Sequence, residues 1–183
     1  MTEEQLVRKS KYLSKHLRHS PESIGLTLAE GGWVGVDDLL AACARNRFSL
    51  SRAELHEVVE KNSKRRFSFD ETGTRIRANQ GHSVDVDLQL SPTTPPDVLY
   101  HGTGHDSVEA ILQAGLIKMN RHHVHLSVDV ETATKVGARH GRPVVLVVDA
   151  KAMSAAGHRF YVSDNGVWLV DVVPSEFLFR QDN

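Results

Sequence analysis

A cluster of prolines constrains the fold of this chain more than any other sequence feature. The segment Ser91-Pro92-Thr93-Thr94-Pro95-Pro96 places three prolines within five positions. Proline fixes φ and lacks a backbone N–H, so this segment cannot continue a helix or a central strand. A chain of 183 residues is long enough for two small lobes. We therefore expect one lobe over residues 1–91, a linker over 92–96 and a second lobe over 97–183.

The first lobe has the pattern of three helices closed by a hairpin. Leu6, Leu13 and Leu17 recur at helical spacing, and Pro21 follows shortly after them. Ser51 and Glu54 form a capping box at the start of a later helix. The expected elements are helices over 3–18, from Val36 and from Ser51, and strands over 66–69 and 75–78 around turn residues 70–73. By analogy, this order favours a winged-helix-like lobe that holds nucleic acid.

The second lobe changes in character and is rich in strand-forming segments. Expected strands cover 98–101, 123–126, 144–148 and 167–170, and expected helices cover 106–114 and 129–137. We therefore expect an α+β chain whose second lobe has a mostly β core.

Composition places the chain in a reducing compartment and does not by itself indicate a nucleic-acid partner. The formal net charge is −1, and neither half of the chain is basic overall. Positive charge is nevertheless clustered at residues 8–18 and 61–66, although such a run is often only a solvated helix face. One cysteine, Cys43, allows no disulfide within the chain, and we see no secretory signal or membrane-spanning run. We expect a cytoplasmic protein.

Three polar clusters are candidates for chemistry, and each has a structural alternative. Arg18 and His19 end the first helix, where they could also simply complement the helix dipole. The segment Tyr100-His101-Gly102-Thr103 follows an apolar strand, where the glycine would let a ligand approach the backbone, or merely form a strand-to-helix turn. The last cluster comprises Arg66, Arg139, His140 and Arg142. These residues could equally be ordinary surface residues.

Two common kinds of site are not expected. The chain has neither a Gly-x-Gly-x-x-Gly pattern nor a Walker pattern, so no nucleotide is held in a Rossmann or P-loop manner. His101, His122, His123 and His125 could be drawn as a zinc site, but they have no cysteine partner and no His-Glu-x-x-His motif. We expect no metal site.

Taken together, eight short stretches give the chain a specific resemblance. It resembles the RNA 2′-phosphotransferase family, also called tRNA 2′-phosphotransferases, over nearly its whole length. The matching stretches are residues 10–19, 32–34, 64–67, 77–83, 99–103, 125–127, 137–141 and 165–169. The resemblance implies an N-terminal winged-helix-like RNA lobe and a C-terminal ADP-ribosyltransferase lobe with a split β-sheet.

The resemblance also implies site residues. A catalytic set of one histidine and three arginines maps onto Arg18, His19, Arg66 and Arg139; Arg66 is chosen over the adjacent Arg65 because it directly precedes the phenylalanine of the motif. NAD⁺, consumed as a co-substrate, would contact residues His101, Gly102, Thr103, His125 and Ser127. Gln80, His82 and Ser83 are further candidates.

The reaction that the resemblance implies has two steps and starts from RNA carrying an internal 2′-phosphate, with tRNA as the expected substrate. The phosphate attacks C1″ of the NAD⁺ ribose and expels nicotinamide; ribose O2″ then attacks the phosphate and expels the RNA 2′-OH. The products are 2′-OH RNA, nicotinamide and ADP-ribose 1″,2″-cyclic phosphate. Guanidinium groups suit the phosphate oxygens, whereas His19 could either hold phosphate or move a proton.

Two other functions stay open at this point. One is an ADP-ribosyltransferase that modifies protein or a nucleic-acid 5′-phosphate end and stops after the first step. The other is a non-enzymatic RNA-binding module, which would leave His101-Gly102-Thr103 and Arg139 unexplained.

Overall fold

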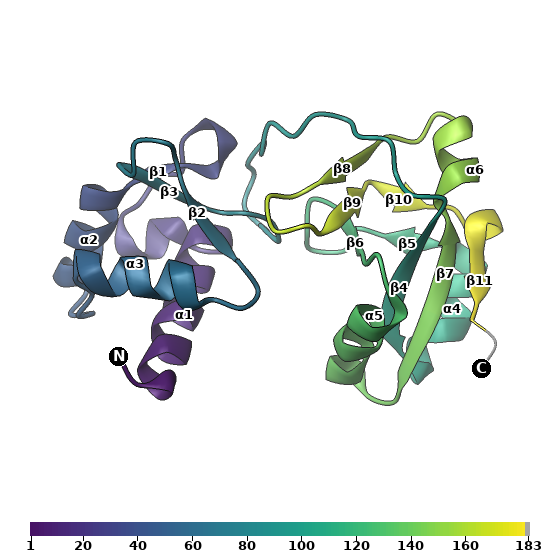
Figure 1. The fold of residues 1–183 in the computed structure, drawn as a ribbon, viewed down its shortest axis with the longest axis horizontal. Coiled ribbons are helices and arrows are strands. Elements are labelled where there is room, and N and C mark those ends of the chain that lie inside the picture. The colour runs from purple at the N-terminus through teal and green to yellow at the C-terminus, as the bar shows by residue number, and fades with distance from the viewer. Residues whose placement is uncertain (182–183) are drawn as a thin grey trace. The chain divides into compact units, whose positions relative to one another are not determined.

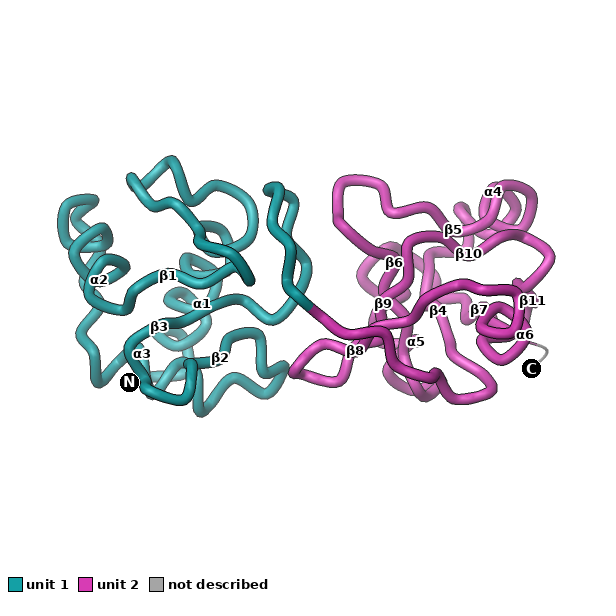
Figure 2. Tube along the Cα trace, turned by 90° about the horizontal axis from the view of Figure 1, so that it is seen from above, with its two compact units in different colours: residues 1–89 teal, residues 90–183 magenta. Residues whose placement is uncertain are grey.

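The chain divides between Gln89 and Leu90, just before the proline-rich segment. Figures 1 and 2 show this division in a computed structural model, which describes residues 1–181. Each of the two units has its own hydrophobic core, and each combines helices with strands, so the expected α+β class is confirmed at that level. The proline-rich segment belongs to unit 2, where the backbone N–H of Thr93 donates to the carbonyl of Phe160 at 2.8 Å.

Unit 1 places three helices around a small antiparallel sheet with strand order β1-β3-β2. Its elements are α1 (Glu3–Arg18), the short 3-10 helices η1 (Pro21–Ile24) and η2 (Glu30–Gly32), β1 (Val34–Gly35), α2 (Val36–Arg45), α3 (Arg52–Lys61), β2 (Phe67–Phe69) and β3 (Arg75–Ala78).

Local sequence signals explain where the helices of unit 1 begin and end. Thr2 and Gln5 form a capping box at the start of α1, and the expected box of Ser51 and Glu54 starts α3. Acidic residues occupy the first turn of α1 and basic residues its last turn, which complements the helix dipole. The predicted helix over 3–18 and strand over 75–78 are therefore confirmed.

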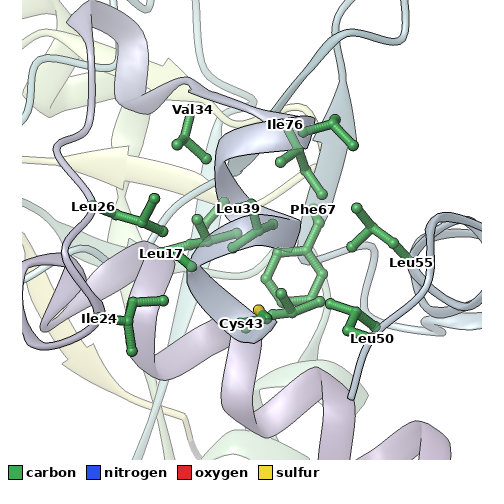
Figure 3. Close-up of a cluster of buried hydrophobic side chains, with 14 of the residues drawn as sticks. Leu17, Ile24, Leu26, Val34, Leu39, Cys43, Leu50, Leu55, Phe67 and Ile76 are labelled. Carbon is green, nitrogen blue, oxygen red and sulfur yellow. The ribbon is translucent and has the colours of Figure 1, made fainter. Parts of the chain in front are cut away.

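Apolar faces of all three helices and the sheet bury a common core in unit 1. Figure 3 shows the side chains of Leu17, Leu39, Phe67 and Ile76 gathered in it. Cys43 also lies there, fully buried, and burial raises the pKa of its thiol to about 11. Leu17 near the end of α1 and Phe67 at the start of β2 both belong to this core, so the core holds these two positions in place.

Unit 2 consists mainly of short strands with helices between them. Over the described residues its elements are β4 (Val98–Gly104), η3 (His105–Ser107), α4 (Val108–Ala114), β5 (Leu116–Ile117), β6 (Val124–Leu126), α5 (Val130–Gly137), η4 (Ala138–His140), β7 (Pro143–Asp149), α6 (Ala150–Ala155), β8 (Phe160–Val162), β9 (Trp168–Val170), β10 (Val172–Val173), η5 (Ser175–Phe177) and β11 (Leu178–Arg180).

Two three-stranded sheets form the framework of unit 2. One has the order β11-β7-β4 and the other β6-β9-β8, while β5 pairs with β10. β4 pairs with β7 along its whole length, from Val98 opposite Asp149 to Gly104 opposite Pro143. A bridge between Tyr100 and Ser127 links β4 to the segment that follows β6, with both backbone hydrogen bonds at 2.8 Å. The two sheets are thus joined beside His101.

The sequence prediction for unit 2 is right for several elements and misses others. β4, β6, β7, β9 and α5 lie where strands and a helix are expected. The missed elements are β5, α6, β8, β10 and β11, each two to six residues long. Segments this short show little periodicity, and the missed strands take their positions from pairing with strands distant in sequence.

Candidate functional site

In unit 1, the segment that follows β3 is hydrogen-bonded to the end of α1. The backbone N–H of Ser83 donates to the carbonyl of Arg18 at 2.8 Å. The Ser83 hydroxyl hydrogen-bonds to Nδ1 of His19 at 2.9 Å. The expected pair Arg18 and His19 is therefore held by a segment some 64 residues further along the chain.

A glycine in the same segment lies against the Arg18 guanidinium. Gly81 has a φ of +84°, and a Cβ built there would lie 3.6 Å from Nη1 of Arg18. The positive φ favours glycine at this position, whereas a separation of 3.6 Å is ordinary van der Waals contact. Arg18 is half-buried, and its guanidinium lies close to the backbone at Gly81.

The backbone of Arg66 is held by Asn79, two residues before Gly81. The backbone N–H of Asn79 donates to the carbonyl of Arg66 at 2.9 Å, and its Nδ2 donates to the carbonyl of Arg65 at 2.7 Å. The Arg66 guanidinium donates from Nη1 to Oδ1 of Asn62 at 3.4 Å. Asn79 itself is buried, being 3% exposed. The segment 79–83 thus contacts Arg18, His19 and Arg66, all three unit 1 residues of the expected catalytic set.

The neighbouring arginine is placed differently. Arg65 is exposed and adopts a left-handed backbone with φ of 43°. Arg66 is half-buried and leads directly into β2. Of the two adjacent arginines, Arg66 is the one whose side chain has a fixed partner in Asn62.

His101 in unit 2 has a defined tautomer. Its Nδ1 lies 3.1 Å from the backbone carbonyl oxygen of His125. A carbonyl can only accept, so Nδ1 carries the proton. Burial lowers the pKa of His101, the hydrogen bond to His125 opposes this shift, and the nearby His140 lowers the pKa further. The neutral ring therefore presents the lone pair of Nε2 as an acceptor.

The glycine after His101 lies against helix α5. The strand does not end at His101 but continues to Gly104, so the expected strand-end position and the alternative turn are both wrong. A Cβ at Gly102 would lie 1.7 Å from the carbonyl oxygen of Ala133 in α5. The missing side chain is thus required by the close approach of α5. Thr103, the next residue, is buried in β4.

His125 lies in β6, and Ser127 directly follows that strand. Nη1 of Arg121 lies 3.1 Å from Nδ1 of His125. An arginine can only donate, so Nδ1 of His125 accepts and the proton of the neutral ring sits on Nε2. Ser127 forms the backbone bridge to Tyr100. Unit 2 therefore presents an acceptor at His101 and a donor at His125.

Arg139 lies in η4, directly after α5. The backbone of η4 packs on the end of β4, because a Cβ at Gly104 would lie 2.2 Å from the carbonyl oxygen of His140. The carbonyl of Arg142 accepts from the N–H of His105 at 2.8 Å. Arg139 itself is exposed, on a short helix that is anchored at both sides.

Some positioning residues are not among the candidates that the sequence singles out. Asn79, Gly81 and Arg121 become visible only through their hydrogen bonds and packing. Of the further candidates, Ser83 contacts His19, and His82 is buried beside Gly32 within unit 1. The sequence around Gly81 gives no signal for the φ of this glycine.

Histidines 122, 123 and 125 do not converge. Nε2 of His123 lies 3.9 Å from Asp171, whereas His125 contacts Arg121. Over residues 1–181, no group of three or more His, Cys, Asp or Glu side chains is arranged to hold a metal ion. In the same part of the chain, no helix is both long and apolar enough to span a membrane.

Comparison with known proteins places the chain in a family. The model of the RNA 2′-phosphotransferase, Tpt1/KptA family matches residues 4–172. The chain belongs to this family. A relative from Nostoc punctiforme, named probable RNA 2′-phosphotransferase, is 65% identical over 97% of this chain and 98% of its own length. Relatives of the same name from Streptomyces griseus and Hahella chejuensis are 60% and 53% identical, over 97% and 98% of this chain. The match to the Tpt1/KptA family covers both units and every site residue described above.

Proposed function

We propose that this chain removes a 2′-phosphate from RNA and transfers it to the ADP-ribose of NAD⁺. The observation that carries the proposal is the segment 79–83, which contacts Arg18, His19 and Arg66 at once. Membership of the Tpt1/KptA family and relatives named probable RNA 2′-phosphotransferase support the same substrate. The products would be 2′-OH RNA, nicotinamide and ADP-ribose 1″,2″-cyclic phosphate.

In this proposal unit 1 is a winged-helix-like lobe that binds the RNA phosphate. Arginine guanidinium groups donate in pairs to phosphate oxygens and keep their charge at any working pH. Arg18 rests on the backbone at Gly81 and Arg66 on Asn62, so neither side chain needs reorganising when phosphate binds. Their placement suits a dianionic substrate.

Unit 2 would be the ADP-ribosyltransferase-type lobe that binds NAD⁺. Its polar groups fit a ribose and a carboxamide, which each offer both donors and acceptors. Nε2 of His101 would accept from a ribose hydroxyl, and Nε2–H of His125 would donate. The backbone of Gly102 would meet the nicotinamide amide, with Thr103 and Ser127 as further contacts. When bound, NAD⁺ supplies a ribose carbon with a good leaving group.

The first proposed step needs positioning rather than a base. A phosphate is already ionised, so Arg18 and Arg66 would aim one of its oxygens at C1″. The new bond is phosphate oxygen to C1″, and the bond that breaks is C1″ to the pyridinium nitrogen. Nicotinamide leaves with that electron pair as a neutral molecule.

The second proposed step is a transesterification at phosphorus. The phosphorus forms a bond to ribose O2″ while its bond to RNA O2′ breaks. The proton lost by O2″ must reach O2′, and His19 would either carry it or hold the phosphate as a cation. The hydrogen bond of Nδ1 to Ser83 fixes the His19 ring for either role. Arg139 would stabilise charge from the NAD⁺ side.

Two finer points belong to the same proposal. We expect tRNA as the substrate, because the family that the sequence resembles is also called tRNA 2′-phosphotransferases. We expect a cytoplasmic location, because the single cysteine fits a reducing compartment.

The test is to incubate a 2′-phosphorylated oligoribonucleotide with NAD⁺ and to follow both the RNA and nicotinamide. The proposal expects dephosphorylated RNA and nicotinamide in equal amounts. Nicotinamide release without 2′-OH RNA would instead indicate an ADP-ribosyltransferase that stops after the first step. Dephosphorylation that proceeds equally well without NAD⁺ would rule out the co-substrate.

A further inference from the structure

The first helix carries a row of cations that leads to Arg18. Arg8, Lys11 and Lys15 follow one another at spacings of three and four residues, so they share one face of α1 with Arg18. Each of the three is exposed. We call these three residues the α1 basic row.

The other cation in this stretch has a structural role, which sets the row apart. Lys9 is buried, and its ammonium forms an ion pair with Glu54 of α3 at 2.6 Å. It thus holds α1 against α3. Elsewhere in unit 1, Arg52, Lys61 and Arg75 pair with carboxylates as well.

The α1 basic row is not neutralised within the part of the chain that the structure describes. No ion pair to Arg8, Lys11 or Lys15 is found among residues 1–181. Glu3 and Glu4 lie in the first turn, and between Gln5 and Ser20 the sequence has no acidic residue. Arg8 rests with its guanidinium 5.9 Å from the centre of the Phe48 ring. Although the whole chain has a formal net charge of −1, this face of α1 is positively charged.

We propose that the α1 basic row binds the RNA backbone next to the 2′-phosphate. The inference rests on the proposed function, which puts the 2′-phosphate at Arg18. From Lys11 to Arg18 the helix rises by roughly 10 Å, so the row extends beyond a single phosphate. A polyanion held at one end of the row would continue along it. Single-stranded nucleic acid is bound in this way by cations that follow its backbone.

The row predicts a dependence on RNA length that the phosphate-binding residues alone do not give. A dinucleotide with a 2′-phosphate would engage Arg18, His19 and Arg66 but not the whole row. A longer strand would gain contacts with Lys15, Lys11 and Arg8 in turn. The row therefore contributes to the affinity for RNA and not to the chemical steps.

The experiment replaces Arg8, Lys11 and Lys15 together by glutamine and measures binding of an oligoribonucleotide without a 2′-phosphate over a range of salt concentrations. Each contact between a cation and a single-stranded phosphate contributes about 0.7 to the slope of log K against log salt, so losing three lowers the slope by roughly 2. Affinity at low salt should fall several-fold. Lys61→Gln is the matched control, because Lys61 is exposed in the same unit but pairs with Glu57.

The activity arm uses two 2′-phosphorylated substrates, a dinucleotide and a longer strand. The triple variant should lose the KM advantage of the longer strand and turn over the dinucleotide as the parent does. Circular dichroism checks that α1 is intact. A triple variant with the salt slope and the KM values of Lys61→Gln would overturn the proposal.

Two further outcomes separate the possible failures. An acidic peptide of equal length that binds as tightly as RNA, with the same dependence on the row, would assign the row to a protein partner and so refute RNA. If RNA binding changes as expected but no 2′-phosphate is ever removed, the proposed function is wrong, and the proposal that the α1 basic row binds RNA is retained.

Discussion

Nδ1 of His101 donates a hydrogen bond to the backbone carbonyl oxygen of His125, across 3.1 Å between two neighbouring segments of unit 2. The bond fixes the ring and leaves Nε2 as an acceptor. In the proposed NAD⁺ site, His101 would thus be arranged for a ribose hydroxyl before any ligand binds. The first two predictions follow from this arrangement.

Replacement of His101 should separate the two substrates. His101→Ala should raise the KM for NAD⁺ and leave RNA affinity unchanged, because His101 belongs to unit 2. His105→Ala, at an exposed position in the same unit, is the control. Steady-state kinetics with varied NAD⁺ and a separate RNA-binding assay would check this. An equal loss of RNA affinity would contradict the division between the units.

The affinity for NAD⁺ should depend on pH through the same ring. Burial lowers the pKa of His101 below its usual 6.5, so the ring is mainly neutral at pH 7. Protonation of Nε2 would remove the acceptor, so NAD⁺ binding should weaken only as pH falls through the lowered pKa. The same shift contributes stability that is present above about 6.5 and is lost as pH falls through the folded pKa. Calorimetric NAD⁺ titrations from about pH 8 down to about pH 5 test this; unchanged affinity throughout would refute it.

The two chemical steps should respond differently to loss of unit 1 residues. Removing one preorganised charge donor at a phosphoryl centre costs on the order of 10²–10³ in rate, whereas nicotinamide loss develops less phosphate charge. Arg66→Ala and His19→Ala should therefore accumulate RNA carrying ADP-ribose on its 2′-phosphate. Arg139→Ala should slow both steps. Single-turnover reactions on a gel that resolves the larger RNA provide the measurement. Equal slowing of both steps in every variant, with no such species, would show that the roles are wrongly assigned.

The adjacent arginines offer a matched pair. Arg66→Ala should lower the rate strongly, but Arg65→Ala should change it less than about threefold, as expected for an exposed surface residue. Both variants change the same charge, so non-specific electrostatics cancels in the comparison. The kcat/KM values for the 2′-phosphorylated oligoribonucleotide decide the matter. If the larger loss follows Arg65, that residue is the catalytic arginine.

Gly102 should not tolerate a side chain. A Cβ there would lie 1.7 Å from the Ala133 carbonyl oxygen, so Gly102→Ala must push α5 away from β4. We expect a loss of more than about 3 kcal/mol in the free energy of unfolding, beyond the usual cost of overpacking. Gly141→Ala, which meets nothing within 4 Å but has a φ of +116° and a ψ of −148°, isolates backbone strain and should cost about 1–3 kcal/mol. Thermal unfolding of both variants is the test, and similar melting temperatures would count against the packing argument.

These positions show which features of the fold and the site can be predicted from the sequence and which cannot. The helix over 3–18 and the capping box at Ser51 are local features, so spacing and capping residues predict them. Arg18 and His19 also follow from the family pattern. Asn79 and Gly81 lie in the matching stretch 77–83, but the sequence assigns them no role, because their importance lies in contacts with residues distant in sequence. At Gly102 the sequence indicates a close neighbour but cannot distinguish a ligand from helix α5.

The sole cysteine of the chain has a practical consequence. Cys43 is fully buried in unit 1, and with a pKa of about 11 its thiol carries almost no thiolate at neutral pH. Thiolate is the form that reacts with maleimides and disulfides. A cysteine introduced at any exposed position would therefore be the only one to take a dye or spin label. Labelling for fluorescence or electron-spin measurements can start from the natural sequence, with the core of unit 1 left intact.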